Sequence, residues 1–404
     1  MKRSERKIQS ATNWQFILGL LCVVFLVASG ILLAEKINDS VKIKAKSTKT
    51  SIVQKKKTSS SPNGVQTARI MANGDLLYHD LLYMSALQSD GTYDFTENYQ
   101  YVKPWLKKAD LVLGDFEGTI RPNYPLAGYP LFNAPESVVS AIKDAGYQVV
   151  DLAHNHILDS QLEGVFSTAK AFEQQGITPI GVYTHKNRDK ASLVIKKVNG
   201  IKIALLAYSY GFNGLEENLS RADYNHHLSD LNEEKMKKEI ERAEKEADIT
   251  VVMPQMGVEY QLEPTQEQKT LYHKMIEWGA DIIFGGHPHV VEPSEVVKQN
   301  GQKKFIIYSM GNFISNQRIE TMDGVENKKW TERGVLMDVT IEKSKKGTII
   351  KNVQAHPSWV SRVAKGTYSP EGYPLYTYQT YILEDFIEGG KYRNQLDQAT
   401  KERI

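Results

Sequence analysis

Short apolar runs alternate with segments of helical spacing along this 404-residue chain, and this alternation constrains the fold more than any other feature. Strand-like runs lie at Leu111–Leu113, Ile249–Met253 and Ile282–Phe284, while Leu231–Asp248 and Thr265–Gly279 have helical spacing. Strands that alternate with helices favour a layered α/β domain. The hydrophobic fraction of 41% is enough for a sizeable core.

Polar side chains follow nearly every predicted strand. Open α/β sheets place their chemistry at the carboxyl ends of strands, so these side chains are expected to meet. Carboxylate, amide and imidazole groups gathered in this way suit one or two ions of Mn, Fe or Zn. The groups are Asp75 with His79, Asp115 with Glu117, His154-Asn155-His156 with Asp159, Gln255 with Glu259, His287 with His289, and Asn312.

Each group also has a plain structural interpretation. Gly-Asp after a strand is a common turn, which would account for Asp75 or Asp115 alone. Asn155 or Asp159 could cap the helix that follows. Asn312 could belong to an ordinary turn. The repetition of strand, turn and ligand-type side chain favours a metal site over these separate explanations.

Composition narrows the classes of function. The net charge of +2 gives no case for nucleic-acid binding, and the single cysteine excludes both an internal disulfide and a cysteine-based zinc site. Residues 14–34 contain an uncharged apolar run about as long as a membrane-spanning helix. We interpret them as an anchor, with residues 1–13 cytoplasmic and residues 35–66 forming a Lys/Ser-rich stalk; a cleaved signal peptide is the alternative.

The orientation of this anchor has evidence on both sides. Four basic residues before it favour a cytoplasmic amino terminus, whereas eight lysines from Lys36 to Lys57 oppose that orientation. Long domains cross the membrane with little regard to charge, so we predict a cell-membrane protein with its main domain outside the cell.

Six motifs in order resemble the CapA/PgsA-type poly-γ-glutamate capsule biosynthesis family, over about residues 70–339. They are Gly74-Asp75, Gly114-Asp115-Phe116-Glu117, Ala153-His154-Asn155-His156-Ile157-Leu158-Asp159, Gly257-Val258-Glu259-Tyr260, Gly286-His287-Pro288-His289-Val290 and Tyr308-Ser309-Met310-Gly311-Asn312-Phe313. The resemblance implies a four-layer α/β sandwich similar to the calcineurin-like metallophosphoesterases. It also implies a divalent-metal site at the strand ends and an anchor before the domain.

The resemblance also implies roles for single residues. Metal ligands would be Asp75, Asp115, Glu117, Asn155, His287 and His289. His156 and Glu259 would take part in catalysis, as acid or transition-state stabiliser and as the group orienting a substrate amine. Further candidates are His79, His154, Gln255 and Asn312. Two positions depart from the metallophosphoesterase pattern, because Leu77 and Gln255 stand where histidine ligands are usual.

The resemblance predicts an extracellular component of poly-γ-glutamate capsule synthesis or export. Its hydrolase-like, metal-dependent site would act on or hold the anionic polymer or its precursor, next to membrane synthase or export subunits. A non-catalytic scaffold that binds polymer and synthase is one alternative, and a general cell-surface metallophosphatase is another. The predicted domain covers residues 67–345, and residues 346–404 form a C-terminal extension.

Overall fold

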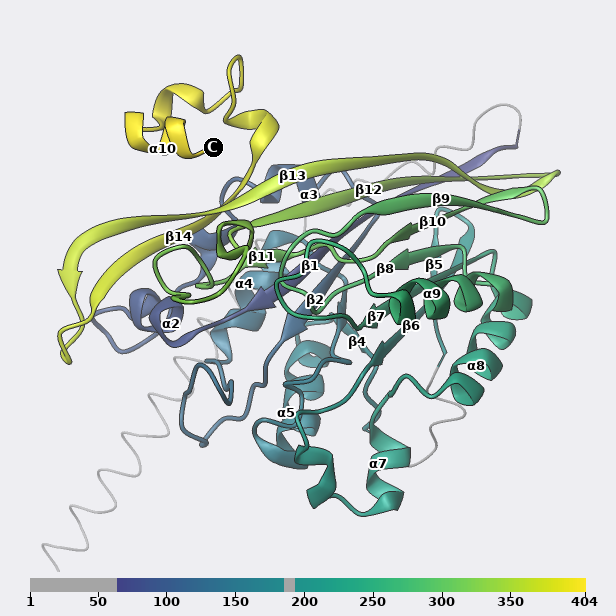
Figure 1. Ribbon diagram of the computed structural model, residues 1–404, viewed down its shortest axis with the longest axis horizontal. Coiled ribbons are helices and arrows are strands. Elements are labelled where there is room, and N and C mark those ends of the chain that lie inside the picture. The colour runs from purple at the N-terminus through teal and green to yellow at the C-terminus, as the bar shows by residue number, and fades with distance from the viewer. Residues whose placement is uncertain (1–63, 185–192) are drawn as a thin grey trace, which may run out of the picture. The chain divides into compact units, whose positions relative to one another are not determined.

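The computed structural model describes residues 64–184 and 193–404, which belong to one compact unit, Ser59–Ile404. Within these residues an eight-stranded sheet has the order β14-β13-β12-β1-β2-β3-β4, with β11 paired to β1 (Figure 1). Strands β1 to β4 are parallel, and β12 to β14 continue the sheet in antiparallel fashion. The bounds are β1 Gln66–Leu77, β2 Leu111–Glu117, β3 Val149–Asp151, β4 Thr178–Ile180, β11 Asn312–Ile314, β12 Arg333–Ser344, β13 Gly347–Tyr368 and β14 Pro374–Ile382.

A second sheet of six strands in the described residues has the order β5-β6-β7-β8-β10-β9. Its central strands β6, β7, β8 and β10 are parallel, and its two edge strands are antiparallel to their neighbours. The bounds are β5 Val194–Val198, β6 Ile201–Ser209, β7 Ile249–Gln255, β8 Ile282–Phe284, β9 Ser294–Gln299 and β10 Gln302–Ile307.

Three apolar clusters join these sheets to helices in four layers. Side chains from one face of each sheet, such as Ile70 and Leu205, pack against each other between the sheets. The outer face of the larger sheet packs on α2, α4 and α5, and that of the smaller sheet on α8 and α9 (Figure 1). The α/β layered fold expected from the sequence pattern is therefore confirmed, and the four layers agree with the fold that the family resemblance implies. Helix bounds are α2 Asp80–Ala86, α3 Lys103–Leu106, α4 Ser137–Ala145, α5 Gln161–Gln174, α7 Arg221–His227, α8 Glu233–Glu246, α9 Gln266–Trp278 and α10 Gln398–Arg403.

Local signals explain where the helices begin and end. Helix α9 begins with a capping box, in which the Thr265 side chain accepts from the Gln268 backbone and the Gln268 side chain accepts from the Thr265 backbone. Helix α4 ends at Gly146, whose φ of 119° suits a residue without a Cβ. These interactions satisfy backbone groups that a helix end leaves without partners.

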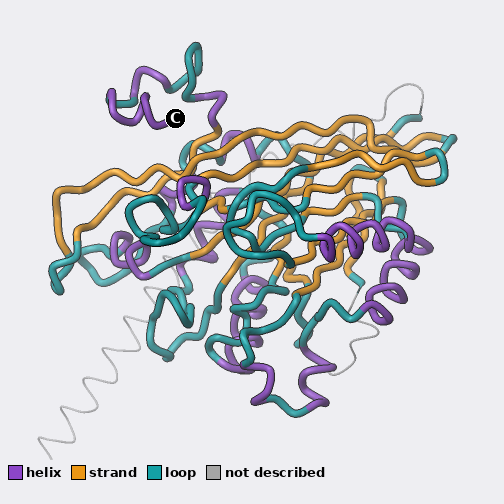
Figure 2. The backbone as a smooth tube through the Cα atoms, in the orientation of Figure 1, coloured by secondary structure: helices purple, strands orange, loops and turns teal. Residues whose placement is uncertain are grey.

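The chain after residue 345 continues the larger sheet. The predicted domain boundary falls at the turn between β12 and β13, and β13 then spans 22 residues (Figure 2). Trp359 on β13 and Tyr381 on β14 pack with Phe386 and Leu396 of the last segment. Residues 346–404 therefore share hydrogen bonds and packing with the strands before them.

The described part of the chain contains no helix long and apolar enough to cross a membrane. The predicted cytoplasmic tail, anchor and nearly all of the stalk fall in residues 1–63, which lie outside the described residues. Those three predictions remain predictions.

Candidate metal centre

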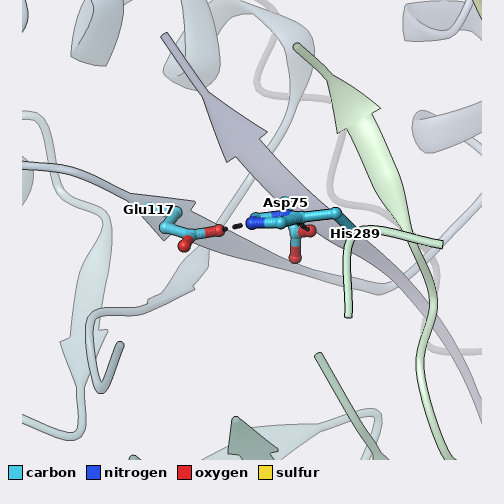
Figure 3. Close-up of side chains that lie close together, drawn as sticks. All are labelled: Asp75, Glu117 and His289. Atoms are coloured by element: carbon cyan, nitrogen blue, oxygen red, sulfur yellow. Dashed lines mark hydrogen bonds and ion pairs between the residues drawn. The ribbon is translucent and has the colours of Figure 1, made fainter. Parts of the chain in front are cut away.

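Asp75, Glu117 and His289 meet where β1, β2 and the loop after β8 come together (Figure 3). His289 Nδ1 lies 2.8 Å from Asp75 Oδ2 and 3.8 Å from Glu117 Oε2. Ligand-type atoms of all three residues lie within 4.8 Å of one another, and all three side chains are buried. In the described residues this is the one such group of His, Cys, Asp and Glu. We call it the acidic trio.

Strand register explains why Glu117 belongs to the acidic trio. In the parallel pairing of β1 with β2, Asp75 is the partner of Asp115 and Leu77 is the partner of Glu117. Glu117 therefore lies beside the position where a histidine ligand was expected and Leu77 stands instead. The trio therefore draws its second carboxylate from β2, while Leu77 on β1 is a buried apolar residue.

The histidine loop holds an uncommon backbone conformation. His287 has a φ of 97° and His289 a φ of 59°, values that residues other than glycine seldom adopt. Gly286 precedes them, and a Cβ on it would lie 2.9 Å from Asp115 Oδ2 and 3.6 Å from Asp75 Oδ1. A Cβ at Gly286 would therefore crowd the Asp115 carboxylate, which shows how closely the loop passes this side chain. Backbone strain of this kind concentrates at functional sites.

Several buried polar atoms of the predicted ligands have no hydrogen-bond partner in the described residues. A buried charge or polar atom without a partner costs free energy, and a bound cation would offset that cost. Carboxylate oxygen, amide oxygen and imidazole nitrogen are also the donors that Mn, Fe and Zn accept. These residues therefore fit a divalent metal. The atoms are Asp75 Oδ1, Asp115 Oδ1, Glu117 Oε1 and Oε2, Asn155 Oδ1 and His287 Nδ1.

Electrostatics agree with a cation at this place. Burial raises the pKa of Glu117 to about 7, and burial together with neighbouring carboxylates raises the pKa of Asp115. Burial alone would lower the pKa of His289, but Glu117 and Asp75 raise it to about 10. In the absence of metal, His289 therefore carries a proton, whose positive charge Glu117 and Asp75 stabilise. The same two carboxylates would stabilise a divalent ion. Burial lowers the pKa of His287 to about 3, so its ring is neutral and able to bind metal.

His156 is held beside the acidic trio by a carboxylate. Its Nδ1 lies 2.7 Å from Asp159 Oδ2, which also accepts the Phe132 backbone N–H at 2.6 Å. Burial lowers the pKa of His156, while Asp159 and Glu117 raise it more. Because Nδ1 is occupied, Nε2 is the atom available to a substrate, as acid–base chemistry requires.

The two remaining members of the predicted core site differ in exposure. Asn155 is buried; its backbone N–H donates to Gln255 Oε1 at 3.0 Å and its Nδ2 donates to Asn213 Oδ1 at 3.3 Å. Glu259 is exposed and lies beside Tyr260, whose pKa is raised by burial and by the Glu259 carboxylate. Asn155 thus lies in the interior, and Glu259 lies at the surface, close enough to act electrostatically on Glu117.

Side chains proposed as further candidates lie around the trio and have structural partners. Gln255 supports the Asn155 backbone and its Nε2 has no partner in the described residues. Asn312 donates its amide to Gln317 Oε1 and to the Thr331 carbonyl, both at 2.9 Å. His154 Nδ1 accepts from the His156 backbone at 3.2 Å, and His79 Nδ1 accepts from the Asn316 backbone at 3.3 Å.

The helix-cap alternative for Asn155 and Asp159 is wrong. Helix α5 begins at Gln161 with Ser160 as its N-cap, and no side chain caps it. Asp159 instead binds His156, as described above.

Sequence reasoning missed four side chains at this site. Asp151 ends β3, is buried, and acts electrostatically on Asp115. The Tyr210 ring lies 4.5 Å from that of His287, and Asn213 bonds Asn155. The Tyr260 ring stacks near His289 at 6.1 Å. Tyr210 and Asn213 follow β6 as the other polar groups follow their strands, so the same pattern could have found them.

Comparisons with known proteins are consistent with these motifs. The model of a family described as bacterial capsule synthesis protein PGA_cap matches residues 69–317. The chain is 33% identical over 228 residues to the capsule biosynthesis protein CapA of Bacillus anthracis, covering 54% of each chain. It is 34% identical over 223 residues to the PGA biosynthesis protein CapA of Bacillus subtilis, covering 54% of this chain and 57% of that protein. The chain thus spans about half the length of the curated relatives it matches.

Solved structures show a weaker likeness. A putative 5'-nucleotidase from Staphylococcus aureus matches with 12% identity and a TM-score of 0.44, covering 72% of this chain and 54% of that one. The calcineurin-like phosphoesterase YfkN of Bacillus subtilis matches with 14% identity and a TM-score of 0.40, covering 72% and 90%. Likeness at this level says nothing of the activity of this chain.

Proposed function

Because this chain belongs to the bacterial capsule synthesis protein family PGA_cap, we propose that it is a membrane-anchored, extracellular component of poly-γ-glutamate capsule synthesis or export. Its metal-dependent site would act on or hold the anionic polymer or its precursor, next to membrane synthase or export subunits. The observation that carries the proposal is the acidic trio, with its buried oxygen atoms that lack partners.

We assign the strongest ion position to Asp75, Glu117 and His289. Asp115, Asn155 and His287 could hold a second ion, but there Gln255 replaces a nitrogen ligand and its oxygen is already bonded to the Asn155 backbone. A bound Mn, Fe or Zn ion would supply an electrophilic centre that polarises a carbonyl or phosphoryl oxygen.

The chain's own side chains would do the remaining work. His156, oriented by Asp159, would give or take a proton through Nε2. Phe132 packs its ring 4.8 Å from that of His156 and fixes the ring's direction. Glu259 and Tyr260, which lie beside the acidic trio, would bind polar groups of the substrate that lie outside the metal centre. This set supports a hydrolase with metallophosphoesterase-like chemistry.

A non-catalytic scaffold is the second candidate, and Gln255 favours it because an amide is a poorer metal ligand than imidazole. The two candidates differ in what they require of His156. A scaffold needs the ion and the shape of the cleft, whereas an enzyme also needs the proton-transfer group.

Two substitutions in the full chain separate these candidates. Cells that lack their own gene would receive wild type, His289→Ala, His156→Gln, or the surface control His273→Ala, whose ring pairs with Glu295 away from the trio. We expect His289→Ala to lose metal by elemental analysis and to abolish polymer output, and His156→Gln to keep metal but lose output. Polymer production by His156→Gln would favour the scaffold, and production by His289→Ala without metal would refute the metal site. Chelator-sensitive turnover of simple phosphoesters without any effect on capsule would point to a general metallophosphatase.

A further inference from the structure

Two β-hairpins meet at the end of the molecule where β1 begins (Figure 1). Gln66, the first residue of β1, is the strand partner of Lys343 on β12, close to the turn into β13. The hairpin of β9 and β10 lies beside β13, and side chains of both line a small cavity. Because Asp75 follows nine residues after Gln66 along β1, the acidic trio lies about 30 Å from this end. We call residues 294–304 and 342–353 together the hairpin face.

The hairpin face is basic, although most of the chain is not. It contains seven lysines and only two glutamates. Residues 1–63 contain twelve of the fifty Lys and Arg residues but three of the forty-eight Asp and Glu residues, so the rest of the chain is net acidic. The positive charge of the hairpin face is therefore a local feature, and it would orient the molecule in front of an anionic surface.

Three of the seven lysines have a carboxylate partner and four do not. The three ion pairs, at 2.5 to 2.7 Å, are Lys304 with Asp281, Lys343 with Asp248 and Lys351 with Glu342. The other four lysines are exposed and make no side-chain hydrogen bond or ion pair within the described part of the chain. These unpaired lysines are Lys298, Lys303, Lys345 and Lys346.

Exposed apolar side chains accompany this charge. Val296 on β9 is 58% exposed and Ile349 on β13 is 49% exposed. Val296 and Lys303 also line the cavity of about 200 Å³ between the two hairpins. Apolar side chains among unpaired lysines suit a membrane interface, where the apolar groups enter the headgroup region and the ammonium groups bind phosphate. A soluble polyanion would use the lysines but would leave Val296 and Ile349 in water.

We propose that the hairpin face docks on an anionic phospholipid membrane, with headgroup phosphates bound by the four unpaired lysines. Residues 1–63 precede β1 and therefore join the described chain at this end, which keeps the face within reach of a membrane that anchors them. In this orientation the metal centre faces away from the bilayer, where polymer that has left the membrane would meet it. The inference rests on the membrane anchoring of the proposed function.

Lysine labelling of the full chain in vesicles tests the proposal. The chain is reconstituted into phosphatidylcholine vesicles with or without phosphatidylglycerol, and acylation by a membrane-impermeant reagent is followed for each lysine by mass spectrometry. One lysine near an anionic surface is worth about fivefold in binding, so we expect the unpaired lysines to react at least about fivefold more slowly with phosphatidylglycerol. Salt at about 0.5 M, where the screening length is about 4 Å, should abolish this protection. Equal rates in both kinds of vesicle overturn the proposal.

A double variant locates the contact. Lys345→Gln with Lys346→Gln removes two of the four unpaired charges and should weaken docking about twenty-five-fold, so Lys298 and Lys303 should again react at nearly the rate seen in neutral vesicles. Soluble poly-γ-glutamate is then added to neutral vesicles. Protection by this polymer, with none by phosphatidylglycerol, would assign the face to the polymer and overturn the proposal.

Two controls complete the test. Lys328→Gln with Lys329→Gln changes another pair of adjacent lysines, on a loop that Asn327 ties to the Tyr260 carbonyl near the acidic trio, and should leave the protection unchanged. Extraction of the vesicles at alkaline pH tests anchoring separately. A chain that is extracted but still protected by phosphatidylglycerol would sustain the docking face and refute the anchor.

Discussion

Glu117→Gln should make the metal-free protein more stable and should remove most of the stabilisation that metal gives to the wild type. Glu117 is buried, and neither of its carboxylate oxygens has a hydrogen-bond partner in the described residues. Without metal its charge is costly to fold, because burial raises its pKa to about 7 from an ordinary value of 4.5. Glutamine has nearly the same shape and carries no charge, so the substitution removes this cost while it removes a ligand.

The magnitude follows from the pKa shift. A carboxyl group whose pKa is higher in the folded state than in the unfolded state destabilises the fold at any pH above its unfolded-state pKa. This loss of folding free energy reaches its full size once the pH exceeds the folded-state pKa. A shift of the Glu117 pKa from 4.5 to about 7 lowers the free energy of unfolding by about 3 kcal/mol at pH 8 and by little at pH 4.5. We therefore expect metal-free Glu117→Gln to be about 3 kcal/mol more stable than wild type at pH 8, a rise of roughly 4 °C in melting temperature.

With metal the difference between the two proteins closes. An ion at a hundred times its dissociation constant stabilises the wild type by about 2.7 kcal/mol, and most of this is lost when a ligand is removed. The assay is thermal unfolding of the full chain by circular dichroism, after chelation and after addition of Mn²⁺, at pH 4.5 and pH 8. Glu277→Gln serves as control for the loss of an exposed charge. A metal-free variant that melts below wild type at pH 8 would refute the reasoning.

Three further substitutions test other parts of the structure. Burial alone would raise the pKa of Asp338, but His356 at 3.6 Å and hydrogen bonds from Arg69 lower it to about 2. The contribution of Asp338 to stability is therefore present above pH 3.8 and is lost as the pH falls towards 2. Asp338→Asn should cost about 2 kcal/mol at pH 6 by urea unfolding, and an equal cost at pH 2 would contradict this. Gln255→His should raise bound Mn towards two equivalents by elemental analysis, and an unchanged ratio would argue against a second ion position. Arg403→Ala should cost about 1–3 kcal/mol, because Arg403 donates to the buried Glu332, and unaltered protease resistance of the C-terminal segment would show that the bond contributes little.

Local sequence signals were sufficient for the layers and for much of the site. Apolar runs predicted the strands, and the segment of helical spacing that begins at Thr265 is α9, with Thr265 as its N-cap. Because parallel strands deliver their carboxyl ends to one edge, Asp75, Glu117 and His289 could be named as ligands before their distances were known. The structure brings these three together, while the roles of all the predicted residues stay predictions.

Pairing between distant strands could not be read from the sequence. The partnership of Leu77 with Glu117 depends on the register of β1 with β2, which packing of the whole sheet decides. The 22-residue β13 was also hard to foresee as part of the main sheet. Much of it is exposed, so its apolar alternation is weak, and it is stabilised by hydrogen bonds to β12 and β14.

The surplus of carboxylates bears on both functional candidates. Four carboxyl groups are buried around the metal centre, those of Asp75, Asp115, Glu117 and Asp151, and Glu259 adds an exposed one nearby. Burial raises the pKa values of Asp115, Glu117 and Asp151, and His289 keeps a proton, so the metal-free site offers little net charge to attract a chain of carboxylates such as poly-γ-glutamate. A bound cation would add positive charge at the point where a substrate oxygen would enter. Under the proposed function, metal would serve polymer binding as well as any reaction, and loss of output on chelation cannot separate scaffold from enzyme. His156 can separate them, because proton transfer is the one task at this site that a cation does not replace.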